Sequence, residues 1–193
     1  MRAKTILLIA VVLFTSEIIA QTYTIDPSHS TVQIQVERFG VVAVSGRFKD
    51  VAGTITYNTE DISRTNAAAI IKVASYDANN AGGEEAVKSK AFLNQGDYPE
   101  ITFKSIRTVS KAGNNYLIGN LTIKDVTQEI ELPFTIKGPL LDLPTQKQSI
   151  ALDASIVINR QDYGINFDRM LPNGIPLVGN EVKITLLILA IAE

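Results

Sequence analysis

The chain has no cysteine and no tryptophan, and it has one histidine, His29. The absence of cysteine excludes disulfides, thiolate catalysis, zinc sites with cysteine ligands and iron–sulfur clusters. A single histidine is too few for a polyhistidine metal site. Most familiar enzyme chemistries therefore lack the residues they need, and we predict no metal site, no other cofactor and no enzymatic activity.

The sequence also lacks an excess of either charge. It contains 18 lysines and arginines against 20 aspartates and glutamates, which gives a formal net charge of −2 at pH 7. Binding of nucleic acid requires a surplus of basic side chains that neutralise phosphates, so we predict no nucleic-acid partner. Long uncharged apolar runs are absent beyond the first 20 residues, which argues against a protein with several membrane spans.

The chain has 193 residues, of which 46% are hydrophobic. That apolar fraction excludes a disordered tail, and the length fits one domain. No internal repeat, low-complexity tract or Pro/Ser-rich linker divides the sequence. We therefore predict one domain over residues 21–193, preceded by a leader.

Residues 1–20 have the pattern of a secretory signal peptide. Arg2 and Lys4 precede the apolar run Thr5–Phe14, and Ala20 supplies a small residue for cleavage. The alternative, an uncleaved anchor, is disfavoured because this run is about half as long as a bilayer span. We predict cleavage near Ala20, a periplasmic or secreted protein, and no stable insertion into the membrane.

Most of the remaining sequence alternates between apolar and polar residues, which is typical of strands with one buried face. In Thr31–Arg38, for example, Val32, Ile34 and Val36 share one face. Similar segments are Ile101–Ser105, Leu117–Ile123, Ile130–Ile136, Ile150–Ile158 and Val182–Ile188, with weaker ones at Val41–Lys49, Gly53–Asn58 and Ala69–Tyr76. Turn-forming residues separate them. The pattern predicts about eight or nine antiparallel strands.

One segment departs from this alternation. Within Gly82–Leu93, residues 84–93 are helix formers with Val87 and Ala91 on one side, so we predict one short helix there. Many strands with one inserted helix fit either a sandwich or a closed barrel, and closure leaves no unpaired edge. An eight-stranded barrel can be filled by its own side chains or can hold one small ligand.

Several motifs in the same order resemble the YceI-like family. They are Tyr23-Thr24-Ile25-Asp26-Pro27-Ser28-His29-Ser30, Val44–Phe48 (VSGRF), Tyr98–Ser105 (YPEITFKS), Gly119–Ile123 (GNLTI), Ile158–Gly164 (INRQDYG) and Val178–Val182 (VGNEV). The resemblance implies an all-β fold, an eight-stranded antiparallel lipocalin-like barrel with the helix around residues 84–93. It also implies a carrier of polyisoprenoids or similar amphiphilic lipids, such as a polyprenyl phosphate or a prenyl quinone.

The chain departs from the family pattern around the predicted helix. Ser75-Tyr76-Asp77-Ala78 stands where the family usually has Ser-Ile-x-Thr, and the histidine that usually precedes the helix is missing. A polar contact to a lipid head group near this helix therefore cannot be carried over from the family.

An isoprenoid tail is a branched hydrocarbon, and burying each methylene-sized group is favourable by about 0.8 kcal/mol. Apolar residues on the inward faces of the strands are the candidates for this contact. We predict a lipid-binding lumen formed by Val32, Ile34, Val36, Phe48, Phe103, Leu121, Phe134, Ile136, Ile156, Ile184 and Leu186, with Phe39, Phe92 and Phe167 near an opening. The alternative is that each of these residues belongs to an ordinary packed core.

Few polar residues suggest chemistry. His29 lies three residues after Asp26, and we favour a structural hydrogen bond over a proton switch. A catalytic triad with Ser28 or Ser30 is opposed by strand geometry, because successive side chains face opposite ways. Arg160 and Asp162 could form an ion pair or meet a polar head group.

Three functional hypotheses follow. The first is an exported carrier that holds a polyisoprenoid or similar long-chain amphiphilic lipid. The second is a stress-protective structural barrel without a ligand, and the third is a hydrolase-like enzyme that uses His29 as a base. The sequence leaves open whether the chain forms a homodimer.

Overall fold

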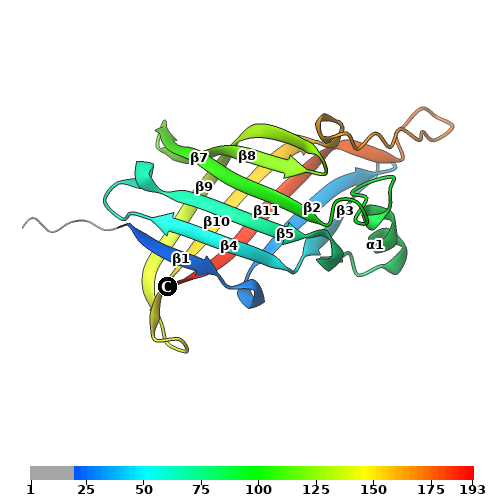
Figure 1. Ribbon diagram of the computed structural model, residues 1–193. Coiled ribbons are helices and arrows are strands. Elements are labelled where there is room, and N and C mark those ends of the chain that lie inside the picture. The colour runs from blue at the N-terminus through cyan, green and yellow to red at the C-terminus, as the bar shows by residue number, and fades with distance from the viewer. Residues whose placement is uncertain (1–19) are drawn as a thin grey trace, which may run out of the picture.

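The computed structural model describes residues 20–193, which form eleven strands, one α-helix and four short 3₁₀ helices (Figure 1). The strands are β1 (Gln21–Ile25), β2 (Thr31–Arg38), β3 (Val42–Phe48), β4 (Val51–Tyr57), β5 (Asn66–Lys72), β6 (Tyr76–Asp77), β7 (Glu100–Lys111), β8 (Asn114–Ile123), β9 (Val126–Asp142), β10 (Lys147–Asn159) and β11 (Val178–Ala192). The helices are α1 (Ala81–Lys88) and the 3₁₀ helices η1 (Pro27–His29), η2 (Ile62–Arg64), η3 (Val73–Ser75) and η4 (Arg160–Tyr163).

The strands close into an antiparallel barrel. Hydrogen bonds link β1, β4, β5, β7, β8, β9, β10 and β11 in that order, and β11 pairs again with β1. The end of β11 pairs with β1, whereas most of its length pairs with β2, so β1 and β2 share one position in the barrel wall. The prediction of an eight-stranded, closed all-β barrel is confirmed.

The break between β1 and β2 has a local cause. Pro27 begins the 3₁₀ helix η1, and the Asp26 side chain accepts a hydrogen bond from the backbone N–H of Ser28. Proline favours such a start because it lacks an N–H and has a fixed φ angle. The chain therefore turns by one short helix and resumes as β2 beside the same strand, β11.

The inserted helix is confirmed, but its bounds differ from the prediction of residues 84–93. Helix α1 begins at Ala81 because the Asn80 side chain accepts a hydrogen bond from Gly83 N–H and the Glu84 side chain accepts one from Ala78 N–H. The Asn80 bond is an N-cap hydrogen bond to the third helical residue, and the Glu84 bond ties the first turn of the helix to the chain before it. The helix ends at Lys88, and Phe92 lies in the turns that follow.

The helix lies at one end of the barrel, away from the C-terminus (Figure 1). Strand β6 precedes the helix and pairs with the end of β3, through Arg47 with Asp77 and Phe48 with Tyr76. The segment between β5 and β7 therefore lies beside the edge of β3.

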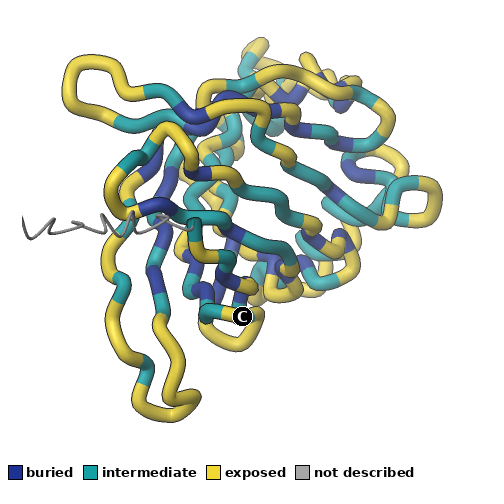
Figure 2. Tube along the Cα trace, turned by 60° about the vertical axis from the view of Figure 1, so that its left-hand side comes forward, coloured by how far each residue is buried: buried dark blue, intermediate teal, exposed yellow. Residues whose placement is uncertain are grey.

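The β9–β10 hairpin projects from the barrel wall as an exposed arm (Figure 2). Its leucines Leu140, Leu141 and Leu143 are exposed. The pairing of Ser149 with Ile191 is the last one between β10 and β11 toward this arm. The arm therefore contributes nothing to the interior of the barrel.

The predicted signal peptide lies outside the described residues, except for Ala20. Cleavage near Ala20 therefore stays a prediction. In the part of the chain that the structure describes, no helix has both the length and the apolar character to span a bilayer.

Candidate functional site

The interior of the barrel contains a cavity of about 770 Å³. Its wall is mostly apolar and includes inward-facing side chains from β2, β7, β8, β10 and β11. Eleven of the predicted lumen residues line it: Val32, Ile34, Val36, Phe48, Phe92, Phe103, Leu121, Ile156, Phe167, Ile184 and Leu186. Strand alternation placed nine of these side chains in the interior, and Phe92 and Phe167 reach it from segments outside the strands. Their contact with a lipid stays a prediction.

Phe39 does not line the cavity, contrary to the prediction for this residue. It occupies the turn between β2 and β3 with a positive φ of 60°. The Arg38 guanidinium lies 4.2 Å from the centre of the Phe39 ring, and the Phe39 N–H donates a hydrogen bond to the Leu177 carbonyl. Phe39 follows the end of β2 at Arg38, and this turn holds its ring beside Arg38 and outside the cavity wall.

Phe134 and Ile136 are likewise absent from the cavity wall, although both lie on the inward face of β9. Phe134 is buried, and both residues belong to or pack on the hydrophobic core. The same core cluster includes Tyr23, Ile150 and Ala190, none of which lines the cavity. We call these five residues the filled end, because their side chains occupy the interior there.

Sequence reasoning missed the part of the wall formed by small residues. Ala67 and Ala69 of β5 line the cavity, as do Gly82, Gly83 and Ala86 of α1. The alternation of Ala67, Ala69 and Ile71 is a signal for an inward face, but alanine is too weak a marker of burial to be selected. These small side chains leave interior volume that larger ones would fill.

Two phenylalanines from distant segments meet at the cavity wall. Phe92 follows α1, and Phe167 precedes β11, and their ring centres are 4.9 Å apart. Tilted aromatic pairs with ring centres at this distance are favourable. The contact joins the helical segment to the long loop before β11, at the end of the barrel where the cavity lies.

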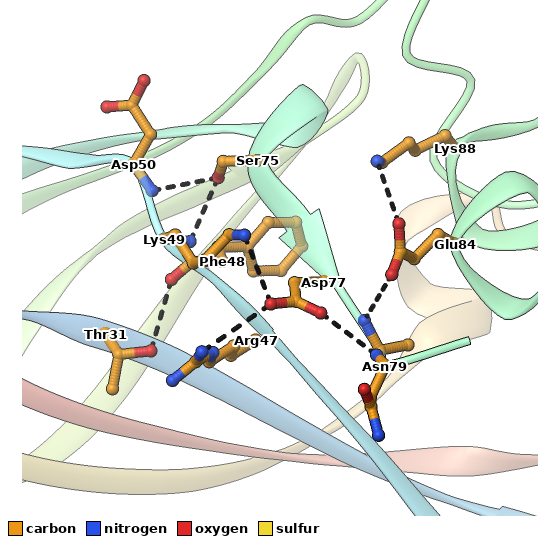
Figure 3. Close-up of polar contacts among 11 residues, drawn as sticks. Thr31, Arg47, Phe48, Lys49, Asp50, Ser75, Asp77, Asn79, Glu84 and Lys88 are labelled. Carbon is orange, nitrogen blue, oxygen red and sulfur yellow. Dashed lines mark hydrogen bonds and ion pairs between the residues drawn. The ribbon is translucent and has the colours of Figure 1, made fainter. Parts of the chain in front are cut away.

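A polar network attaches the helical segment to β3 (Figure 3). Asp77 Oδ2 lies 3.2 Å from Lys49 Nζ and 3.7 Å from Arg47 Nη2, and Asp77 Oδ1 accepts a hydrogen bond from Asn79 N–H. The Asn79 N–H and then the Lys49 ammonium hold the pKa of Asp77 below its usual value. The Ser75 hydroxyl accepts hydrogen bonds from the N–H groups of Lys49 and Asp50.

Arg160 is a buried positive charge beside the cavity, with 4% of its surface exposed. Its guanidinium donates hydrogen bonds to the carbonyls of Gly179, Ile165, Phe167 and Val178 and to the Asn180 side chain. Burial lowers the pKa of Arg160. Because these protein oxygens occupy its donors, Arg160 holds the loop after η4 against β11 and has no ion pair with Asp162.

His29 lies outside the cavity, and its side chain is 70% exposed. Its Nδ1 lies 2.6 Å from Asp26 Oδ2. This hydrogen bond is the main reason that the pKa of Asp26 is lowered. Ser30, the nearest buried serine, exchanges hydrogen bonds with the backbone of Leu189. No Ser–His–Asp relay forms among these residues, and the favoured structural interpretation of His29 matches this geometry.

A closed antiparallel barrel around an apolar cavity is the architecture of a lipocalin-like barrel. The comparison with known proteins is more specific. A family model described as the YceI-like domain matches residues 23–190, and the chain belongs to this family. The resemblance found in the sequence motifs is confirmed.

Relatives in sequence and in structure agree with the family. A UPF0312 protein of Staphylococcus aureus strain N315 is 29% identical over 161 residues, which are 83% of this chain and 92% of the relative. BcnA of Burkholderia cenocepacia aligns with a TM-score of 0.75 at 22% identity, over 86% of this chain and 99% of BcnA.

A further solved structure has the same fold at lower identity. A polyisoprenoid binding domain from Saccharophagus degradans, implicated in plant cell wall breakdown, aligns with a TM-score of 0.67 at 12% identity. The alignment covers 90% of this chain and 99% of that domain. At this identity the likeness establishes a shared fold.

Proposed function

We propose that this protein is an exported carrier that holds a polyisoprenoid or a similar long-chain amphiphilic lipid inside its barrel. The observation that carries the proposal is the cavity of about 770 Å³ with its wall of branched and aromatic side chains. Ligand sites in proteins commonly measure about 300–1,000 Å³. The cavity has the size of a ligand site and the lining that a hydrocarbon chain requires.

The chemistry of the wall supports a prenyl tail. Valine, isoleucine and leucine from several strands face the cavity, and Phe48 and Phe103 add aromatic surface. Such a wall buries methyl and methylene groups without directional bonds, and each buried group contributes about 0.8 kcal/mol. The Saccharophagus degradans neighbour with this fold is a polyisoprenoid binding domain, which also supports this ligand class.

Binding is favoured over catalysis. The single histidine, His29, lies outside the cavity. Arg160 lines the cavity, but its guanidinium already donates hydrogen bonds to oxygens of the protein. A general base must reach the proton that it removes. Neither group is placed to act on a molecule in the lumen, so we propose that the protein is not an enzyme. The cavity also argues against a purely structural barrel, which would be filled.

Export is proposed from the leader alone. The charged start, the apolar run and Ala20 form the pattern of a signal peptide. The test is the mass of the mature protein in a periplasmic or culture-medium fraction. A chain that begins near Gln21 supports export, and a full-length chain retained in the cytoplasm contradicts it.

The carrier proposal is tested with the protein purified from its natural source. Organic extraction followed by mass spectrometry is expected to yield a lipid with a prenyl chain. Addition of prenyl lipids to delipidated protein is expected to raise the melting temperature, because a ligand that binds only the folded state stabilises it. Repeated preparations without lipid, together with an unchanged melting temperature, would overturn the proposal.

A further inference from the structure

Tyr76 places a phenol ring in the wall of the cavity. The residue is 7% exposed and lies on β6, and its ring centre is 5.2 Å from that of Phe48. Gly46 on β3 makes the room, because a Cβ atom at Gly46 would lie 2.2 Å from the Tyr76 hydroxyl oxygen. Glycine at this position therefore lets the ring lie against the backbone of β3.

The hydroxyl of Tyr76 has no hydrogen-bond partner among residues 20–193. A buried tyrosine hydroxyl usually has one. Among residues 20–193, Thr65 Oγ1 is the polar side-chain atom that is fully buried and also lacks a hydrogen-bond partner. The Tyr76 hydroxyl oxygen lacks a partner too, but it is not fully buried. It keeps contact with open volume, and Tyr76 lines the cavity. A donor is thus available to a molecule in the lumen.

The other polar side chains of the wall differ from Tyr76. Arg38, Ser45 and Asn80 line the cavity but are exposed. Arg160 is buried, but protein oxygens occupy its guanidinium. In the described wall, Tyr76 is therefore the buried polar residue whose donor is uncommitted.

The surroundings of Tyr76 disfavour an anion. Burial raises the pKa of the Tyr76 hydroxyl, and the carboxylates of Glu84 and Asp77 raise it further. Asp77 is paired with Lys49 and Arg47, and Glu84 Oε2 lies 4.0 Å from Lys88 Nζ, so the nearby cations already have partners. A buried charge without a partner is costly. The hydroxyl stays protonated at neutral pH and acts as a neutral donor.

We infer that the Tyr76 hydroxyl donates a hydrogen bond to a neutral carbonyl oxygen on the head of the bound lipid, as in a prenylated quinone. A phosphate head beside Tyr76 would meet Arg47, Lys49 and Lys88, whose charges are already paired with Asp77 and Glu84. This inference rests on the proposed carrier function and names the head group that the cavity selects. Tyr76 is then a specificity-determining residue, while the apolar wall binds the tail.

The test uses the mature chain and three probes with the same four-unit prenyl tail. The probes are a benzoquinone, a hydrocarbon and a monophosphate. The variant Tyr76→Phe removes the hydroxyl and keeps the ring against Gly46 and Phe48. The matched control is Tyr163→Phe, because Tyr163 is also buried but does not line this cavity.

Calorimetric titration is expected to show that Tyr76→Phe weakens quinone binding by about three- to ten-fold, the range for one neutral hydrogen bond. Hydrocarbon and monophosphate binding should not change, and Tyr163→Phe should bind all three probes as the unaltered chain does. Infrared spectra should show a lowered quinone carbonyl stretch in the unaltered chain and a return toward the free value in Tyr76→Phe.

The outcomes separate this inference from the carrier proposal. Tight binding of all probes, with quinone affinity and carbonyl stretch unaltered in Tyr76→Phe, would overturn the role of Tyr76 alone. A loss confined to the monophosphate would overturn the choice of a neutral head group. Binding of the monophosphate alone would likewise overturn the neutral head group. If none of the three probes binds the unaltered chain, the carrier proposal itself fails.

Discussion

The two ends of the barrel interior are built from the same kind of strand and have opposite outcomes. At the filled end, Tyr23, Phe134 and Ile150 are buried in the core and do not line the cavity. Toward α1, alanines of β5 and small residues of α1 line a cavity of about 770 Å³ together with aliphatic side chains of β2 and β11. The difference teaches that an alternating apolar strand defines an inward face, whereas the summed size of the facing side chains decides whether a hollow remains.

The largest expected effect comes from opening the filled end. Phe134→Ala removes a buried ring that other core side chains surround, so we expect the free energy of unfolding to fall by about 3–5 kcal/mol. Urea denaturation measures this loss. Prenyl lipid affinity of the folded variant should be nearly unchanged. A loss below about 1 kcal/mol would show that this end is not tightly packed.

Filling the cavity should have the reverse effect and lower lipid affinity rather than stability. Ala69→Leu adds a larger side chain to the cavity wall and excludes a few carbon groups of a lipid tail, so we expect affinity to fall roughly ten- to thirty-fold. Calorimetric titration with a prenyl hydrocarbon checks this. The control is Ala52→Leu on the neighbouring strand β4, because Ala52 is exposed and lies outside the wall. Equal affinities in both variants would contradict the cavity assignment.

A polar substitution sharpens the same comparison. Ile156→Thr places a hydroxyl in the cavity wall, where it meets the lipid tail without a partner, and we expect prenyl lipid affinity to fall about five- to ten-fold. The matched change at the filled end is Ile150→Thr, since Ile150 has 1% of its surface exposed. That variant should lose more stability and less affinity. Retained affinity in folded Ile156→Thr would remove Ile156 from the lumen.

The smallest expected effect lies outside both ends, at the junction of β1 and β2. The His29 hydrogen bond and the Ser28 N–H lower the pKa of Asp26 from the ordinary value of 3.8. A lowered pKa in the folded state stabilises it above pH 3.8, and this contribution is lost as the pH falls further.

The Asp26→Asn variant should therefore lose less melting temperature than the unaltered chain between pH 5 and pH 3. The difference should be about 2 °C or less, since exposed pairs contribute little. Scanning calorimetry at the two pH values measures it. A larger loss in Asp26→Asn would reverse the sign that we expect.

Much of the fold could be read from the sequence because period-two alternation places side chains on one face or the other. This worked for β2 and for the long strands β7 to β11. It gave no guide to Phe39, which lies beyond the end of β2 in a turn with a positive φ angle. It also misplaced the start of α1, because the hydrogen bonds of Asn80 and Glu84 set that boundary and apolar spacing does not reveal them.

The site was predictable in part for the same reason. Large apolar residues such as Ile156 and Ile184 were expected inside and line the cavity. Ala67, Ala69 and the glycines of α1 were missed, since small residues carry little hydrophobic signal. Tyr76 could not be assigned a role either, because its position depends on Gly46, which is 30 residues away in the sequence.

The sequence by itself excluded the chemistries that need cysteine, and it determined the β class of the fold and the sidedness of most strands. These features depend on composition and on neighbours within a strand. Only the tertiary structure decided which inward residues fill the barrel and which surround a cavity. Free volume is the difference between the space enclosed by eight strands and the side chains that they direct into it, so no single strand can encode it.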